Sequence, residues 1–273
     1  MNWGTFSSRY QSILLVLIFW ILQSPPLEAQ FDMVVFEKRS PQAQSRQELN
    51  AVLDIVQTTD PQKIVPLCGN FRKQFPTSEF LGHVYRMEMH AYAGLNDSSK
   101  VIATGEKALE VNSHDVDALL TLANAIPNGV EDLTPESAAL LDKAETYARR
   151  ALEEIDGLHA TRGVTLDRWR KLTGRMRSSA QEALGFIAFK RGNYAASVAE
   201  LEKSIRLNPE AGGPLFFRLG VAYLYDGKLL EAQVALERSS TLGPEYIRTK
   251  AQEQLAKLGR QSSPGGGPKS TSR

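Results

Sequence analysis

The chain has 273 residues, of which 42% are hydrophobic and 23% charged, and these fractions exclude both an intrinsically disordered chain and a bundle of membrane helices. Its 32 Lys and Arg against 31 Asp and Glu leave a net charge of +1, which gives no support to wholesale binding of nucleic acid or of an anionic membrane. With one cysteine, Cys68, the chain has neither an intramolecular disulfide nor a cysteine-based zinc site.

The first 29 residues follow the order of regions found in secretory signals. Arg9 precedes the wholly apolar run Ile13–Leu22, and two prolines follow before Ala29. As a helix, this run spans about 15 Å, roughly half of a hydrocarbon core of about 30 Å. We therefore expect cleavage near Ala29 and export to the periplasm or the exterior, with an N-terminal arm at 30–44. The alternative is a chain anchored by an uncleaved N-terminal segment.

From 47 to 258 the apolar residues recur at helical spacing, and Gly, Asn, Asp and Pro interrupt them about every dozen residues. The stretch 183–210 reads as two helices separated at Gly192 and ended by Pro209, because proline does not continue a helix. Shifted by 35 residues, it aligns with 218–245, and nine of the 27 pairs from Leu184/Leu219 to Glu210/Glu245 are identical. Each 35-residue step therefore predicts one helix–turn–helix hairpin.

This spacing resembles the tetratricopeptide repeat, a unit of 34 residues with the pattern W-x2-L-G-x2-Y, then A-x3-F, then P. The copy at 213–246 carries the positions of that pattern as Phe216, Leu219, Gly220, Tyr223, Ala232, Leu236 and Pro244. The resemblance implies an all-α fold, an α-solenoid of stacked helix–turn–helix repeats. Such hairpins must stack, because none buries its apolar face alone.

The copies are expected in a repeat domain that spans 45–259. In chain order these are a degenerate copy at about 45–78, copies at 82–115, at 116–158 with an insert, at 178–211 and at 213–246, and a capping helix at 246–259. The last segment, 260–273, is rich in Gly, Ser and Pro, and this composition predicts a disordered tail.

A basic segment precedes the copy at 178–211. Its cations are Arg162, Arg168, Arg170, Lys171, Arg175 and Arg177. Because Leu166, Trp169 and Leu172 recur among them at helical spacing, the segment predicts an amphipathic helix. Two interpretations remain open: a solvated face opposite a packed one, or a docking surface for an acidic partner or anionic headgroups.

The chain lacks the spacings of known catalytic motifs: H-E-x-x-H, G-x-S-x-G, the P-loop, G-x-G-x-x-G and C-x-x-C. We therefore expect no enzyme activity, cofactor, metal, nucleic acid or small-molecule substrate. His114 with Asp115 and Asp117 comes nearest to a metal cluster, but such residues commonly cap helix ends. Cys68 lies in a helical apolar pattern, which favours a buried structural thiol.

In tetratricopeptide repeat proteins the first helices of the repeats line a concave groove. Carried over, the resemblance implies a groove that binds a peptide or protein segment. Its residues would be Arg86, His90, Asn124, Phe186, Phe189, Phe217, Val221, Leu224 and Tyr225. Two alternatives remain: the capping helix or Phe31–Phe36 covers the aromatic residues, or the chain is a structural subunit or adaptor of a cell-envelope complex.

Overall fold

The computed structural model describes residues 41–160 and 163–262, and these ranges contain eleven helices and no strand. The helices are α3 (Arg46–Gln57), α4 (Pro61–Gln74), α5 (Leu81–Gly94), α6 (Ser98–Val111), α7 (Val116–Asn128), α8 (Pro135–Gly157), α9 (Leu166–Lys190), α10 (Tyr194–Leu207), α11 (Gly213–Tyr225), α12 (Leu229–Leu242) and α13 (Glu245–Ser262). The predicted signal segment, residues 30–40 of the predicted arm, Arg162 and residues 263–273 lie outside the described residues.

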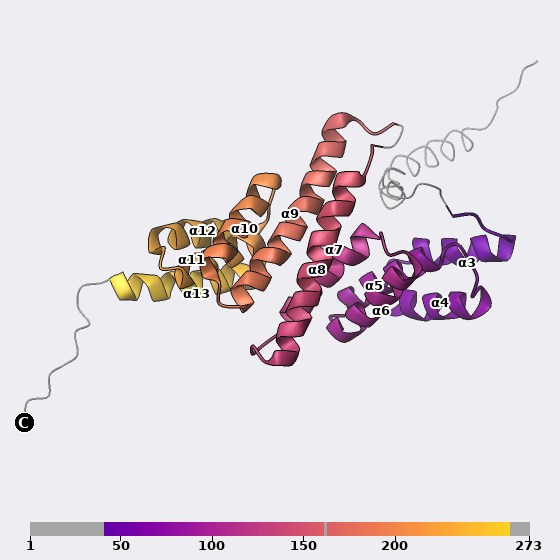
Figure 1. Cartoon of the computed structure of the whole chain (residues 1–273), viewed down its shortest axis with the longest axis horizontal. Coiled ribbons are helices and arrows are strands. Elements are labelled where there is room, and N and C mark those ends of the chain that lie inside the picture. The colour runs from indigo at the N-terminus through magenta and orange to yellow at the C-terminus, as the bar shows by residue number, and fades with distance from the viewer. Residues whose placement is uncertain (1–40, 161–162, 263–273) are drawn as a thin grey trace, which may run out of the picture. The chain divides into compact units, whose positions relative to one another are not determined.

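Residues 41–159 and 163–262 belong to one unit, in which consecutive helices pack as hairpins (Figure 1). The pairs are α3 with α4, α5 with α6, α7 with α8, α9 with α10, and α11 with α12, and α13 packs on the last pair. First helices of successive pairs also touch, since α9 contacts both α7 and α11. The predicted fold class, an all-α solenoid of helical repeats, is confirmed.

Side chains that accept hydrogen bonds from backbone N–H groups define where most helices begin. These N-cap residues are Ser45, Asp60, Asp97, Asp115, Thr134, Thr165 and Asn193. The turns within the last two hairpins contain Gly192 at φ 75° and Gly227 at φ 78°, a region that glycine adopts without steric penalty. Local sequence therefore fixes the lengths of the hairpins before they stack.

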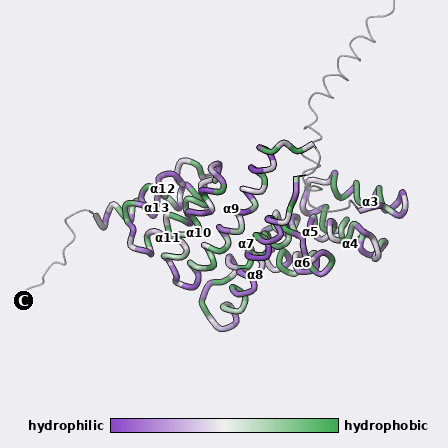
Figure 2. Tube along the Cα trace, turned by 45° about the horizontal axis from the view of Figure 1, so that its top comes forward, coloured by the Kyte–Doolittle hydropathy of each residue, from purple (hydrophilic) through white to green (hydrophobic). Residues whose placement is uncertain are grey.

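Apolar and polar residues alternate along the helices (Figure 2), so each hairpin buries one side. The largest buried cluster joins α7, α8 and α9, and includes Leu119, Leu141 and Ile187. A second cluster joins α10, α11 and α12 around Leu201 and Phe216. Because these clusters draw on neighbouring hairpins, the hairpins stabilise one another.

Identical residues 35 positions apart in the last two hairpins have the same surroundings in the structure. A Cβ atom on Gly185 would lie 2.7 Å from Leu201 Cγ, and one on Gly220 would lie 2.7 Å from Leu236 Cγ. Each glycine therefore lets the second helix of its own hairpin approach closely. Both leucines are fully buried, at 1% and 0% exposure.

Two buried serines that lie 35 positions apart also make equivalent hydrogen bonds. Ser204 Oγ donates to Ser178 O at 2.8 Å, and Ser239 Oγ donates to Gly213 O at 2.9 Å. Both bonds tie a second helix to the first helix of its own hairpin. The sequence signal was present, since the two serines are among the identical pairs of the alignment, but their role was not foreseen.

Two helices are longer than the others and break the regular spacing. α8 has 23 residues and α9 has 25. The described part of the predicted basic segment and the first helix of the copy at 178–211 form one continuous helix, α9, so residue 178 lies within a helix and not at its start.

Candidate functional site

A small cavity lies between the first helices of the last two hairpins. Its walls are Phe186 and Phe189 of α9 together with Phe217 and Val221 of α11. Its volume is about 90 Å³, and its surface is almost entirely apolar. Four of the nine residues expected in the groove therefore meet at one place.

Two further side chains reach this cavity from α10, Ser197 and Leu201. Ser197 is fully buried, and its hydroxyl has no hydrogen-bond partner among the described residues. Leaving a buried hydroxyl unpaired costs about 1–3 kcal/mol.

Aromatic rings continue from the cavity to the end of α11. The ring of Phe189 lies 6.5 Å from that of Phe186, 5.4 Å from Tyr194 and 5.2 Å from Tyr225, measured between centroids. The rings of Tyr194 and Tyr225 lie 4.9 Å apart. Tyr225 is 60% exposed, so this aromatic row extends from a buried wall to an accessible ring.

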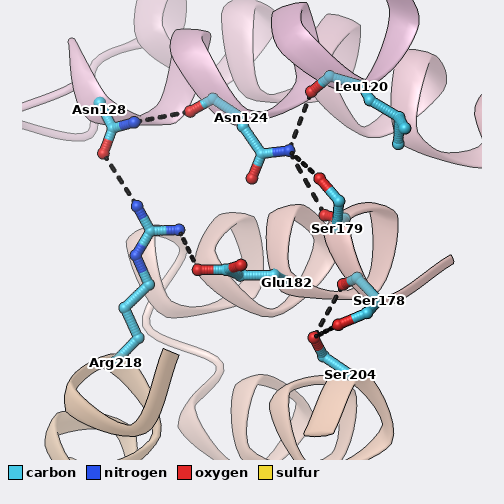
Figure 3. Close-up of polar contacts among 8 residues, drawn as sticks. All are labelled: Leu120, Asn124, Asn128, Ser178, Ser179, Glu182, Ser204 and Arg218. Atoms are coloured by element: carbon cyan, nitrogen blue, oxygen red, sulfur yellow. Dashed lines mark hydrogen bonds and ion pairs between the residues drawn. The ribbon is translucent and has the colours of Figure 1, made fainter. Parts of the chain in front are cut away.

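The guanidinium of Arg218 closes one side of the cavity. It lies 4.5 Å from the ring centroid of Phe186, and its Nη1 donates to Glu182 Oε1 at 3.0 Å. Its Nη2 donates to Asn128 Oδ1 at 3.4 Å, so one side chain of α11 reaches both α9 and α7 (Figure 3). Burial raises the pKa of Glu182, and the charge of Arg218 opposes that rise.

Asn124, another expected groove residue, joins α7 to α9. Its Nδ2 donates to Ser179 Oγ at 3.1 Å and to Ser179 O at 3.4 Å, and also to Leu120 O at 2.9 Å (Figure 3). The amide group therefore holds two first helices together. It lies on the same polar row as Glu182 and Arg218.

The two expected groove residues of α5 have different surroundings. Arg86 is buried, with its Nη1 3.4 Å from Asp115 Oδ2, while its Nε and Nη2 have no hydrogen-bond partner among the described residues. His90 is exposed, and its Nε2 lies 2.6 Å from Asp117 Oδ2. That hydrogen bond raises the pKa of His90 above its ordinary value, although partial desolvation by neighbouring groups opposes the rise.

The C-terminal helix contacts part of the predicted groove. Phe217 and Leu224 pack against a cluster of Leu236, Ala251 and Leu258, the last two from α13. The capping helix thus covers one edge of the aromatic residues, and the cavity remains on the other edge. Residues 31–36, the other proposed cover, lie outside the described residues.

Three cations of the basic segment already have acidic neighbours. Arg175 Nη2 lies 2.6 Å from Glu210 Oε2, and Arg177 Nη2 lies 2.9 Å from Asp156 Oδ1. Lys171 Nζ lies 3.7 Å from Asp167 Oδ2, one turn away on α9. These ion pairs favour the interpretation of a solvated helix face.

The residues nearest to a metal cluster point to separate partners. His114 Nδ1 lies 2.7 Å from Glu154 Oε1, whereas Asp115 pairs with Arg86 and Asp117 with His90. Within 41–160 and 163–262, no three His, Cys, Asp or Glu side chains converge as metal ligands would.

The single thiol lies in the core. Cys68 is fully buried, and burial raises its pKa to about 12. A thiol with so high a pKa is protonated at neutral pH, and the thiolate is the reactive form.

Within the described ranges, no helix has the length and apolarity that crossing a membrane requires.

Comparison with known sequence families finds a match for one of these hairpins. Residues 178–210 match the tetratricopeptide repeat. This segment covers the C-terminal half of α9 and all of α10, and it is the copy in which the cavity begins. Among curated proteins, no sequence matches the chain.

The fold is shared with one of the solved structures described below, and a second gives a weaker superposition. A thermophilic TPR protein in Thermus thermophilus superimposes with a TM-score of 0.53 at 15% identity, over 77% of this chain and 99% of that chain. BtubC (BKLC) from P. vanneervenii gives a TM-score of 0.46 at 16% identity, over 79% of this chain and 80% of that chain.

Proposed function

We propose that the chain binds a peptide segment of a partner protein, with one apolar side chain of that segment seated in the cavity between α9 and α11. The observation that carries this proposal is the cavity itself, whose four main walls come from equivalent faces of two successive first helices. A fold that serves typically as an interaction scaffold, rather than as an enzyme, agrees with this role.

The size and lining of the cavity define the ligand. A volume of about 90 Å³ exceeds the share of one water, about 30 Å³, and suits a single apolar side chain. Tyr225 extends the contact surface beyond the cavity.

The expected affinity is modest. Burying one large apolar side chain contributes about 1.5–3 kcal/mol, whereas a dissociation constant of 1 μM requires about 8.2 kcal/mol. The anchor therefore supplies part of the binding, and the aromatic row from Phe189 to Tyr225 supplies the rest. Micromolar or weaker binding follows.

A selection from a random library of displayed peptides tests the proposal. The chain should enrich sequences that share one apolar position, and Phe186→Ala or Phe217→Ala should weaken the selected peptide about 10- to 100-fold, the range that corresponds to about 1.5–3 kcal/mol. Tyr246→Ala is the matched control, because Tyr246 is 61% exposed and does not line the cavity. Equal affinity of all three variants would rule out the cavity as the binding site.

Export near Ala29, an acidic partner at 162–177 and a role in an envelope complex are separate proposals. Export rests on the sequence alone, in which Arg9, the apolar run Ile13–Leu22 and two prolines precede Ala29. Sequencing of the N-terminus of the chain secreted by a host should give Gln30 as the first residue.

A stable complex of fixed stoichiometry in native mass spectrometry would favour the envelope-subunit role over transient peptide binding.

A further inference from the structure

A second apolar surface lies on the last hairpin, away from the cavity already described. It is an open crevice of about 470 Å³ between α11 and α12. Phe216 and Tyr223 of α11 contribute to one side, and Leu230 and Val234 of α12 form the other. Leu230 is 79% exposed and Val234 is 65% exposed, so both present branched apolar side chains to the surface.

The fold does not require apolar residues at these two places. In the preceding hairpin, 35 residues earlier, Leu230 and Val234 correspond to Ala195 and Ala199, which are also exposed. An exposed position in a repeat normally carries a small or polar residue, and contiguous exposed apolar side chains mark an interaction site. The last hairpin therefore carries large apolar side chains at two exposed positions where the preceding hairpin, with the same fold, has alanine.

The matching crevice of the preceding hairpin is polar. It lies between α9 and α10, and Arg191 and Glu200 line it, with Glu145 and Arg149 of α8 across from them. The counterpart of Glu200 in the last hairpin is Ala235, at the apolar crevice. The change from polar to apolar is therefore specific to the last hairpin.

Segments of the same chain do not fill this crevice among the described residues. The C-terminal helix α13 packs on the other side of α12, against Ala232 and Leu236. The sequence 263–273 contains only Ser, Pro, Gly, Lys, Thr and Arg, so it offers no large apolar side chain. Neither α13 nor residues 263–273 therefore supply the occupant.

Two charges on α12 define that occupant. Glu231 and Arg238 lie two helical turns apart, one on each side of Val234, and both line the crevice. Neither has an ion-pair partner among the described residues, and the guanidinium of Arg238 lies 4.4 Å from the ring centroid of Phe216. If a second α12 lies antiparallel across Val234, each Glu231 faces the Arg238 of the other copy.

We propose that two copies of this chain associate through the crevice between α11 and α12, about a two-fold axis near Val234. Such an axis requires a self-complementary surface, in which residue i meets j and j meets i. The pair of opposite charges with an apolar centre meets this requirement. The interface lies apart from the cavity between α9 and α11, so a dimer keeps two peptide-binding sites.

Sedimentation equilibrium of the purified chain, over a range of concentrations, tests this arrangement. Wild type should show a monomer–dimer equilibrium. Val234→Glu should shift it to monomer, and Glu231→Arg or Arg238→Glu should each raise the dissociation constant at least 10-fold. The double variant Glu231→Arg/Arg238→Glu should recover most of the loss, because the exchanged charges face each other again.

The controls separate association from unfolding. Leu140→Glu is the matched variant, because Leu140 is 46% exposed on α8 and lies outside the crevice. It should leave the equilibrium unchanged, and circular dichroism should show equal helix content for all variants. A wild-type chain that is monomeric at every concentration would overturn the proposal. A dimer insensitive to Val234→Glu, or a double variant weaker than both single variants, would also overturn it.

Discussion

Substitution of Gly220 by alanine tests the close approach on which the stacked hairpins depend. The added Cβ atom would lie 2.7 Å from Leu236 Cγ, 2.9 Å from Leu236 Cδ2 and 3.3 Å from the backbone nitrogen of Leu236. Leu236 is fully buried, so its side chain has no solvent into which to rotate. The contact with the added Cβ atom can then be relieved only if α11 and α12 move apart.

Two opposing effects set the magnitude. Alanine is favoured over glycine in a helix interior by about 0.5–1 kcal/mol. Overpacking of a filled core costs about 1–3 kcal/mol. Gly220→Ala should therefore lower the free energy of unfolding by about 0–2.5 kcal/mol. Gly185→Ala should behave alike, since its Cβ would lie equally close to Leu201.

Gly69→Ala is the matched control, since a Cβ on Gly69 of α4 would meet nothing within 4 Å. The control should gain about 0.5–1 kcal/mol. Urea denaturation followed by circular dichroism should thus place the two variants about 1–3 kcal/mol apart, with opposite directions. If Gly220→Ala stabilised the chain as much as Gly69→Ala, the close approach of α11 and α12 would be wrong.

Three further predictions concern single side chains. Ser239→Ala removes the bond to Gly213 O and should cost about 1 kcal/mol of unfolding free energy in the same urea assay. The NMR titration of His90 should show a pKa above 6.5, and Asp117→Asn should lower it. Because the folded pKa of His90 is raised and that of Asp117 is lowered, the pair contributes full stability between the ordinary pKa values of 3.8 and 6.5, and the contribution disappears as pH rises through the folded pKa of His90 or falls through that of Asp117. Cys68 should react with a thiol reagent only after denaturant is added, given its burial and its pKa of about 12.

The fold could be predicted from the sequence because each hairpin repeats the residue pattern of the one before it. Identical glycines and leucines 35 residues apart, such as Gly185 and Gly220, meet identical neighbours in the structure. Four residues of the cavity were among those that the resemblance to the tetratricopeptide repeat implied for the groove. Phe186 and Val221 hold the same position of successive copies, so the face of one first helix predicts the face of the next.

The polar contacts were not accessible in this way. Arg218 bonds Glu182, 36 positions earlier, and Asn128, 90 positions earlier, and no local pattern connects these residues. Arg86 was expected on the groove, yet it lies buried against Asp115 of the next hairpin. Helical spacing indicates which side of a helix a residue occupies, but the neighbour on that side depends on how hairpins stack.

The bonds of Arg218 have a consequence for the energetics of recognition. One planar cation braces three first helices, through Asn128 on α7, Glu182 on α9 and its own backbone on α11. The spacing of the two helices that form the cavity is consequently set in the empty protein. If a peptide binds as proposed, it meets helices whose separation these bonds already hold, so the receptor loses little ordering entropy when the complex forms.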